Sequence, residues 1–191
     1  MADTKKIMIV GVGGQGTLLA SRILGRAVID MGYDVKVSEV HGMSQRGGSV
    51  VTYVKFGDKV YSPIIDCGEA DIILAFELLE AYRALPYLKQ GGRMIVNTQC
   101  INPMPVITGA AVYPENIAEK LAQKADTTTV DALALAGEAG SIKAVNVVLI
   151  GLMAKNTDIP YDVWKKAVTE TVPPKFLQVN LRAFDLGYHH Q

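Results

Sequence analysis

Residues 7–31 read IMIVGVGGQGTLLASRILGRAVIDM, and the pattern of apolar residues changes within this stretch. Ile7 to Val10 form a continuous apolar run, which is typical of a strand that is buried on both faces of a sheet. From Ala20 onward the apolar residues recur at helical spacing, and Gly32 follows as a residue that commonly ends helices. The stretch therefore predicts a strand, a glycine-rich turn and a helix, which is the Rossmann-like opening unit of an α/β domain.

The turn between this strand and this helix is the first candidate site. Its spacing, Gly-x-Gly-x-x-Gly, fits a dinucleotide-binding turn, and free amides at a helix N-terminus suit an anion. Thr17 follows the last glycine directly, so the lysine of a phosphate-binding P-loop is missing. The alternative is that the glycines only allow the strand and the helix to pack closely. The candidate residues are Gly11, Gly13, Gly14, Gln15 and Gly16.

A second glycine-rich segment, HGMSQRGG at residues 41–48, is the other candidate site. Two adjacent glycines beside an arginine could form a concave backbone under a guanidinium, which suits a carboxylate or a phosphate. The alternative is an ordered surface loop in which Arg46 pairs with a local acid or a partner chain and His41 is a structural hydrogen bonder. We expect the two candidate sites to lie side by side at the carboxyl ends of the first two strands. The candidate residues here are His41, Ser44, Gln45, Arg46, Gly47 and Gly48.

The residues on either side of the second segment predict a mixed sheet. Residues 35–37 read as the second strand, which ends near Glu39, where a dinucleotide-binding fold would place an acid for the ribose. Residues 49–56 read SVVTYVKF, which is a strand pattern, and Gly57-Asp58 suggests a turn. Residues 59–61 would then form a second strand that runs back beside the first. We therefore expect an inserted β-hairpin in place of the usual crossover helix.

The remainder alternates between strand and helix patterns. Strands are predicted at residues 71–76, 93–97 and 127–131, and helices at 77–88, 114–124, 132–139, 161–171 and 177–186. We expect Gln90-Gly91-Gly92 to close the first of these helices and residues 99–109 to be an extended loop. A further helix within residues 143–155 is apolar nearly all round, so it should be buried in the core or under a partner.

Composition predicts a single domain over residues 1–191. Acidic and basic residues balance at 19 each, which favours neither nucleic acid nor an anionic membrane as a partner. Cys67 and Cys100 should be reduced and interior, and with no room for a signal peptide before the first strand we expect a cytoplasmic protein. The apolar helix and the glycine-rich loop also predict self-association when the natural partner is absent.

Reactive groups are few. No cluster of Cys, His and carboxylates has metal-ligand spacing, and two cysteines are too few for an iron–sulfur cluster. No Gly-x-Ser-x-Gly nucleophile turn is present, and Gly57-Asp58 lacks the third glycine of the usual thiamine diphosphate motif. We identify no catalytic residue, and the chain looks like one part of a larger assembly.

Two motifs resemble a known family. GVGGQGTLLASRILGRA near the start and EVHGMSQRGGSVVTYVKFG after it resemble the gamma-type domain of the 2-oxoacid:ferredoxin oxidoreductases. The HGMSQRGGSV form is most similar to the small (beta) subunits that act on indolepyruvate. The resemblance continues through Asp71, the Gln90-Gly91-Gly92 turn and Asn146 to NLRAFDLG at residues 180–187, so it covers essentially the whole chain.

The resemblance implies a three-layer α/β/α domain with a mixed, mostly parallel sheet. It also implies a large (alpha) catalytic subunit that carries thiamine diphosphate and 4Fe-4S clusters, while this chain holds no cofactor of its own and is inactive alone. The holoenzyme would decarboxylate an aryl 2-oxoacid oxidatively, reduce ferredoxin and form an acyl-coenzyme A. Coenzyme A is then a candidate ligand at the interface of the two subunits.

Two other functions compete with this one. A stand-alone NAD(P)- or flavin-binding protein would use residues 11–16 and Glu39, but the expected hairpin takes the place of its crossover helix. A purely structural interaction module, with no enzymatic complex, is the other.

Overall fold

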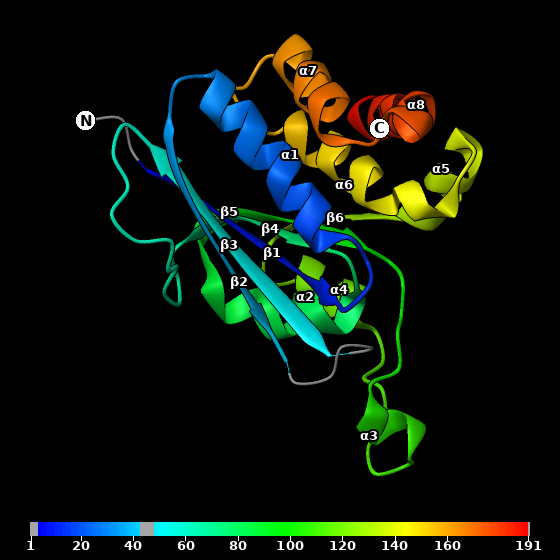
Figure 1. The fold of residues 1–191 in the computed structure, drawn as a ribbon. Helices are drawn as coiled ribbons and strands as arrows, with labels where there is room; N and C mark the ends of the chain where they lie inside the picture. Colours follow the sequence, from blue (N-terminus) through cyan, green and yellow to red (C-terminus); the bar gives the residue numbers. More distant parts are fainter. Residues whose placement is uncertain (1–3, 43–47, 191) are drawn as a thin grey trace.

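The computed structural model describes residues 4–42 and 48–190, and in them six strands form one sheet in the order β2-β3-β1-β4-β5-β6 (Figure 1). The strands are β1 (Lys5–Val12), β2 (Asp34–His41), β3 (Ser49–Gly57), β4 (Ala70–Ala75), β5 (Leu88–Asn97) and β6 (Asp126–Val130). The longer helices are α1 (Thr17–Asp30), α2 (Leu78–Ala84), α5 (Ala132–Ala139), α6 (Val145–Ala154), α7 (Tyr161–Thr171) and α8 (Leu177–Tyr188). The shorter ones are α3 (Met104–Ile107), α4 (Ile117–Ala122) and the 3₁₀ turns η1 (Leu85–Tyr87), η2 (Ile142–Ala144) and η3 (Pro174–Phe176).

The sheet is mixed and mostly parallel, as the sequence and its family resemblance predict. β1, β4, β5 and β6 run parallel to one another, whereas β3 is antiparallel to both β1 and β2. β2 therefore runs in the same direction as β1, although β3 separates them. The carboxyl ends of β1 and β2 consequently reach the same edge of the sheet.

The inserted hairpin is present, but it is formed by β2 and β3. The predicted return strand at residues 59–61 is wrong, because these residues leave the sheet after Gly57. The Val60 N–H donates to the Asp34 side chain at 2.9 Å, and Val60 and Ile65 are buried. Burial of this segment against the molecule replaces strand pairing, and β2 and β3 pair directly as antiparallel neighbours.

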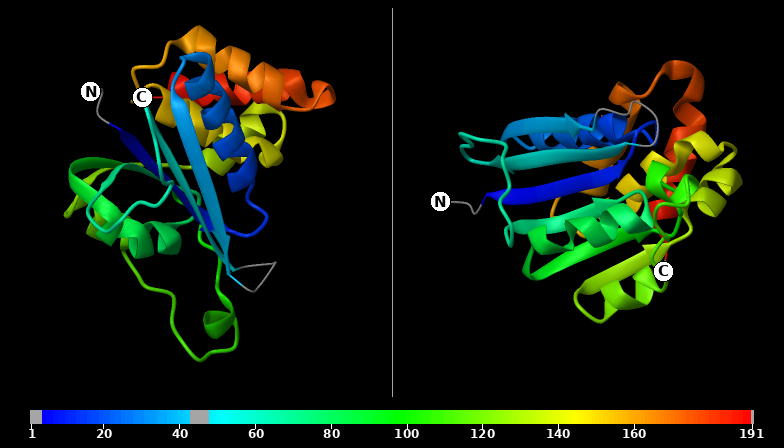
Figure 2. Two further views of the ribbon diagram at one scale, coloured as in Figure 1. Left: turned by 60° about the vertical axis from the view of Figure 1, so that its left-hand side comes forward. Right: turned by 90° about the horizontal axis from the view of Figure 1, so that it is seen from below.

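Helices cover both faces of the sheet, so the three-layer expectation is confirmed. One face packs against α1, α5, α6, α7 and α8, and the other against α2 and α4 (Figures 1 and 2). The two cores are separated by the alternation of side chains along β1: Ile7 and Ile9 face the first, whereas Met8 and Val10 face the second. This arrangement explains why the first strand is apolar at successive positions.

The apolar helix α6 lies in the core, with all ten of its residues buried. Its neighbours are α1, α5 and α8, so no partner chain is needed to cover it. Because the apolar surface of α6 is already buried within the chain, this helix gives no reason to expect self-association.

Three further expectations are corrected. The helix expected to end at residues 90–92 ends at Ala84, and those residues belong to β5, where the register shifts opposite Ala70 and Gly91 has a φ of 75°. The extended loop at residues 99–109 contains the short helix α3. Both cysteines are free, as expected, but exposed rather than interior, because the segments that carry them run over the surface. None of the helices in the described ranges is long and apolar enough to cross a membrane.

Candidate functional site

Gly48, the last residue of the second glycine-rich segment, lies beside the turn after β1, at the edge of the sheet where the prediction placed both segments. The Gly13 N–H donates to the Gly48 carbonyl at 3.0 Å, and Val12 pairs with Ser49 at the start of β3. The turn after β1 is thus tied by its backbone to the end of the hairpin connection. Of the second segment, His41 and Gly48 are described, whereas Ser44, Gln45, Arg46 and Gly47 lie outside the described residues.

His41 and Glu39 pair with each other at the end of β2. His41 Nε2 lies 2.7 Å from Glu39 Oε1, and the Thr52 hydroxyl of β3 donates to Glu39 Oε2 at 3.0 Å. Both carboxylate oxygens of Glu39 are therefore engaged by neighbouring strand residues. This is the structural role considered for His41, and it engages the carboxylate that a dinucleotide-binding fold would use for the ribose.

Gln15 stabilises the turn after β1 through hydrogen bonds of its side-chain amide. Its Oε1 accepts the Val12 N–H at 2.8 Å, and its Nε2 donates to the Phe76 carbonyl at 2.9 Å and to Gln99 Oε1 at 3.1 Å. Both amide protons are used, so Gln15 joins the end of β1 to the residues that follow β4 and β5. The side chain therefore stabilises the turn and has no amide proton left to donate to a ligand.

Close packing accounts for two glycines of the turn, and open space surrounds a third. A Cβ on Gly11 would lie 2.9 Å from Gln15 Oε1, and one on Gly16 would lie 2.6 Å from Asn146 Nδ2. A Cβ on Gly14 would meet no atom within 4 Å. Gly16 is also the N-cap of α1, and no side chain caps that end. Gly14 itself and the first-turn amides of α1 are thus the part of the turn that another molecule could approach, since the Gly13 and Gln15 N–H groups already donate to the Gly48 and Val12 carbonyls.

Sequence reasoning missed the buried polar residues that follow β4 and β5 at this edge. Glu77 is completely buried; its carboxylate accepts the Glu80 N–H at 2.9 Å, the Ile101 N–H at 3.0 Å and the Tyr113 hydroxyl. Asn97 donates to the Phe76 carbonyl at 3.0 Å and accepts the Ala132 N–H at 3.1 Å. The available signal was a polar residue directly after each buried apolar run, in DIILAFE and RMIVN.

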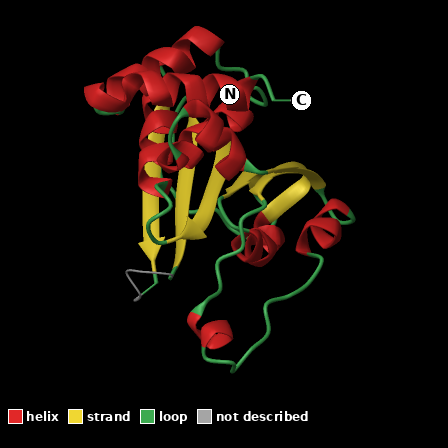
Figure 3. Cartoon of the chain, turned by 90° about the vertical axis from the view of Figure 1, so that its right-hand side faces the viewer, coloured by secondary structure: helices red, strands yellow, loops and turns green. Residues whose placement is uncertain are grey.

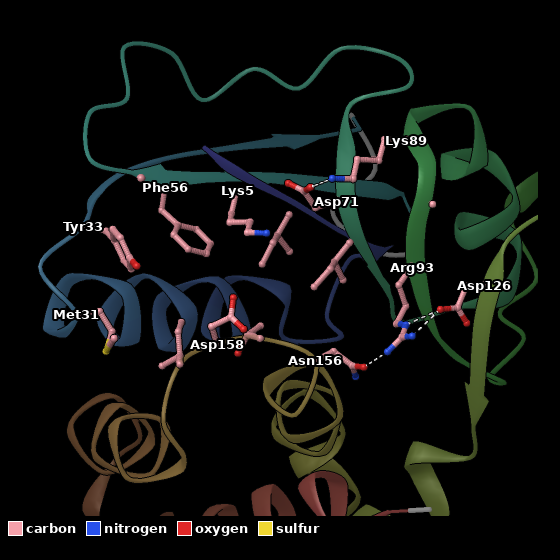
Figure 4. Close-up of a pocket in the computed structure, with 16 residues that line it drawn as sticks. Lys5, Met31, Tyr33, Phe56, Asp71, Lys89, Arg93, Asp126, Asn156 and Asp158 are labelled. Carbon is pink, nitrogen blue, oxygen red and sulfur yellow. Dashed lines mark hydrogen bonds and ion pairs between the residues drawn. The ribbon is translucent and has the colours of Figure 1, made fainter. Parts of the chain in front are cut away.

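A cavity with a volume of about 440 Å³ lies at the opposite end of the parallel strands (Figure 4). Ile7 and Phe56 contribute to its apolar lining, and ion pairs join Lys89 to Asp71 and Arg93 to Asp126 around it. None of the candidate residues that the structure describes lines this cavity. Within the described ranges, no group of three or more His, Cys, Asp or Glu side chains could hold a metal ion.

Comparison with known proteins identifies the relatives of this chain. A family model described as "Pyruvate ferredoxin/flavodoxin oxidoreductase" matches residues 6–190. "Indolepyruvate oxidoreductase subunit IorB" of Pyrococcus horikoshii is 46% identical over 187 residues, which are 95% of this chain and 93% of that protein. The match therefore extends over nearly the full length of both proteins.

Solved structures confirm the fold. The gamma subunit of a keto/oxoacid ferredoxin oxidoreductase from Geobacter sulfurreducens superposes with a TM-score of 0.72 at 26% identity and covers 96% of each chain. A 2-oxoglutarate:ferredoxin oxidoreductase from Magnetococcus marinus shares the fold, with a TM-score of 0.75 at 19% identity. It matches 98% of this chain but only 31% of its own, so in that protein the fold is one part of a longer chain. These comparisons give no support to a stand-alone NAD(P)- or flavin-binding protein.

Proposed function

We propose, from the premise that this chain belongs to the pyruvate ferredoxin/flavodoxin oxidoreductase family, that it is the small subunit of an indolepyruvate or related aryl-pyruvate ferredoxin oxidoreductase. The observation that carries this proposal is the 46% identity to an indolepyruvate oxidoreductase subunit over 95% of the chain. The family match over residues 6–190 spans the β2–β3 hairpin, which is the element that distinguishes this fold from a dinucleotide-binding domain.

The proposed division of labour places the chemistry in a large subunit. That partner would carry thiamine diphosphate and 4Fe-4S clusters, decarboxylate the 2-oxoacid, pass electrons to ferredoxin and form the acyl-coenzyme A. The small chain would complete the large subunit's active-site mouth and be inactive alone. We propose a cytoplasmic location, with which two free cysteines agree.

The surface proposed to face the large subunit is the carboxyl edge of β1 and β2. Gly14 and the first-turn amides of α1 are its open backbone groups, next to Gly13, Gly48 and His41. Gly11, Gln15 and Gly16 support this surface from within. Ser44, Gln45, Arg46 and Gly47 remain part of the proposal through the sequence alone, with the Arg46 guanidinium as the donor for a partner carboxylate or a phosphate.

Coenzyme A is the ligand of the holoenzyme that this surface could touch. Amides at an uncapped helix N-terminus suit the anionic groups of its phosphates, and Gly14 leaves room for close approach. Thiamine diphosphate and the iron–sulfur clusters would stay with the large subunit.

Reconstitution tests the proposed function. The two subunits are produced separately, and 2-oxoacid-dependent reduction of a viologen dye is measured for each alone and for the mixture. We expect activity only in the mixture, with indolepyruvate a better substrate than pyruvate at equal concentration. Robust dye reduction by the small chain alone, or no association with any large subunit encoded beside it, would overturn the proposal.

The site is tested by Arg46→Ala in the reconstituted complex. Loss of the guanidinium should lower turnover several-fold while the melting temperature of the isolated chain stays nearly unchanged. Unfolding of the variant chain, together with normal turnover in whatever complex still assembles, would show that Arg46 is structural.

A further inference from the structure

The segment formed by residues 99–113 projects away from the sheet and its helices. Figures 1 and 3 both show it leaving the body of the molecule after β5, with α3 near its tip. The chain then returns toward α4, which packs beside α2. We refer to residues 99–113 as the arm.

The arm is exposed, apolar and uncharged. Met104 is 59% exposed, Ile107 64% and Val112 87%. No Asp, Glu, Lys, Arg or His occurs between Arg93 and Glu115. Apolar patches of this kind mark interaction sites, and charged residues are depleted where interfaces are fully buried. The chemistry of the arm therefore fits an apolar recess rather than an anionic or cationic partner.

Local hydrogen bonds give the tip a defined shape. The Ile107 N–H donates to the Pro103 carbonyl at 3.1 Å, the Thr108 N–H to the Met104 carbonyl at 2.9 Å, and the Ala111 N–H to the Pro105 carbonyl at 3.0 Å. Pro103 and Pro105 also restrict the backbone. A tip that is ordered before it binds loses less conformational entropy when it docks.

The base of the arm is anchored to the buried carboxylate of Glu77. Glu77 accepts hydrogen bonds from Ile101 at one end of the arm and from Tyr113 at the other, and the Leu79 N–H donates to the Tyr113 hydroxyl at 3.1 Å. Burial, and then the hydrogen bond to Glu77, raise the pKa of the Tyr113 phenol, so this donor keeps its proton to a higher pH than an ordinary phenol does. Both ends of the arm are thus fixed at one buried point, and only the tip is left without cover.

The position of the arm points to the large subunit as its partner. Gln99, its first residue, accepts a hydrogen bond from Gln15, so the arm starts beside the turn that is proposed to face the large subunit. A recess that receives the tip would be continuous with that interface.

We propose that the arm docks into an apolar recess of the large subunit and anchors the two subunits to each other, an inference that rests on the proposed function. Met104 and Ile107 are the anchoring side chains, with Val112 beside them on the arm. A second copy of this chain is the competing occupant, which the test below distinguishes.

The test uses Met104→Asp/Ile107→Asp, with Tyr61→Asp as the control. Tyr61 is 89% exposed and lies in the segment between β3 and β4, away from the arm, so its substitution also removes an exposed apolar side chain and adds a charge. Affinity for the purified large subunit is measured by calorimetry, and the melting temperature of each isolated chain is measured in parallel. We expect the arm variant to bind at least tenfold more weakly, because hot-spot side chains at interfaces have effects of this size. The control should bind normally, and the melting temperatures of both variants should be nearly unchanged.

Each other outcome has a separate meaning. Equal binding of the wild-type and the arm variant would overturn the docking proposal and leave the proposed function intact. Failure of the wild-type itself to bind would overturn the proposed function. If light scattering shows that the arm variant loses self-association but keeps normal affinity for the large subunit, the arm binds a second copy and the proposal is wrong.

Discussion

The turn after β1 and the crossing of α6 with α8 both depend on glycine, yet only the turn carries a recognisable motif. In the turn, a Cβ on Gly16 would lie 2.6 Å from the side chain of Asn146, whereas at the crossing a Cβ on Gly187 would lie 2.0 Å from the backbone carbonyl of Val148. Side chains can rotate away, but the backbone of a packed helix cannot. The stricter requirement for glycine is therefore at the crossing, where no motif points to it, and a glycine motif by itself does not separate ligand binding from close packing.

Gly187→Ala should lower the free energy of unfolding more than a substitution of any glycine in the turn. The added methyl group can be accommodated only if α8 moves away from α6, which would loosen the packing of a helix whose ten residues are all buried. We expect a loss of about 3 kcal/mol in the free energy of unfolding, at the upper end of the usual cost of overpacking. Urea denaturation measures it, and a loss below about 1 kcal/mol would show that the crossing can relax.

Gly16→Ala should cost less, about 2 kcal/mol, because two smaller penalties combine there. Gly16 has a φ of 84°, which disfavours residues with a Cβ, and the new methyl group would displace the Asn146 amide that donates to the Gly16 carbonyl at 3.3 Å. A double-mutant cycle with Asn146→Ala separates these contributions. If the two substitutions are simply additive, the contact with Asn146 is not the reason for glycine at this position.

Within the turn itself, Gly14→Ala should cost less stability than Gly16→Ala. Gly14 has a φ of 96° but open space around its Cβ position, so only the backbone penalty of about 1 kcal/mol should appear in the isolated chain. If a partner or ligand approaches Gly14 in the holoenzyme, the same substitution should also lower turnover in the reconstituted complex. Normal turnover at equal occupancy would place the interface elsewhere on this edge.

Patterns that are local in the sequence predicted most of the fold. The opening strand, turn and helix, the buried helix α6 and the amphipathic helix α7 follow from the periodicity of apolar residues, which records what each face packs against. The partner of β3 was not predictable in the same way. Residues 59–61 look like a strand locally, but β2 is the longer partner, and burial of Val60 takes the chain out of the sheet.

The candidate site was predicted in position but not in its supporting contacts. The glycine spacing and the expected strand directions were enough to bring Gly13 next to Gly48. The roles of Gln15 and Glu77 depend on atoms more than 20 positions away in the chain, in Phe76, Gln99, Ile101 and Tyr113. The 440 Å³ cavity likewise collects residues from five strands and two loops that are far apart in the sequence. Long-range contacts of this kind leave no periodicity in the sequence.

Gly137→Ala should have the smallest effect and the opposite sign. Gly137 lies in α5, is exposed, and would place a Cβ with no atom within 4 Å, so the new methyl group meets neither backbone nor side chain. Alanine loses less backbone entropy than glycine when a helix forms, and the expected result is a gain of about 0.5–1 kcal/mol in the free energy of unfolding. The same denaturation series as for Gly187→Ala measures it, because both substitutions add one methyl group to a helix. A loss of stability instead would mean that α5 needs glycine for a reason other than space, and the comparison between open and closely packed glycines would then fail at its simplest position.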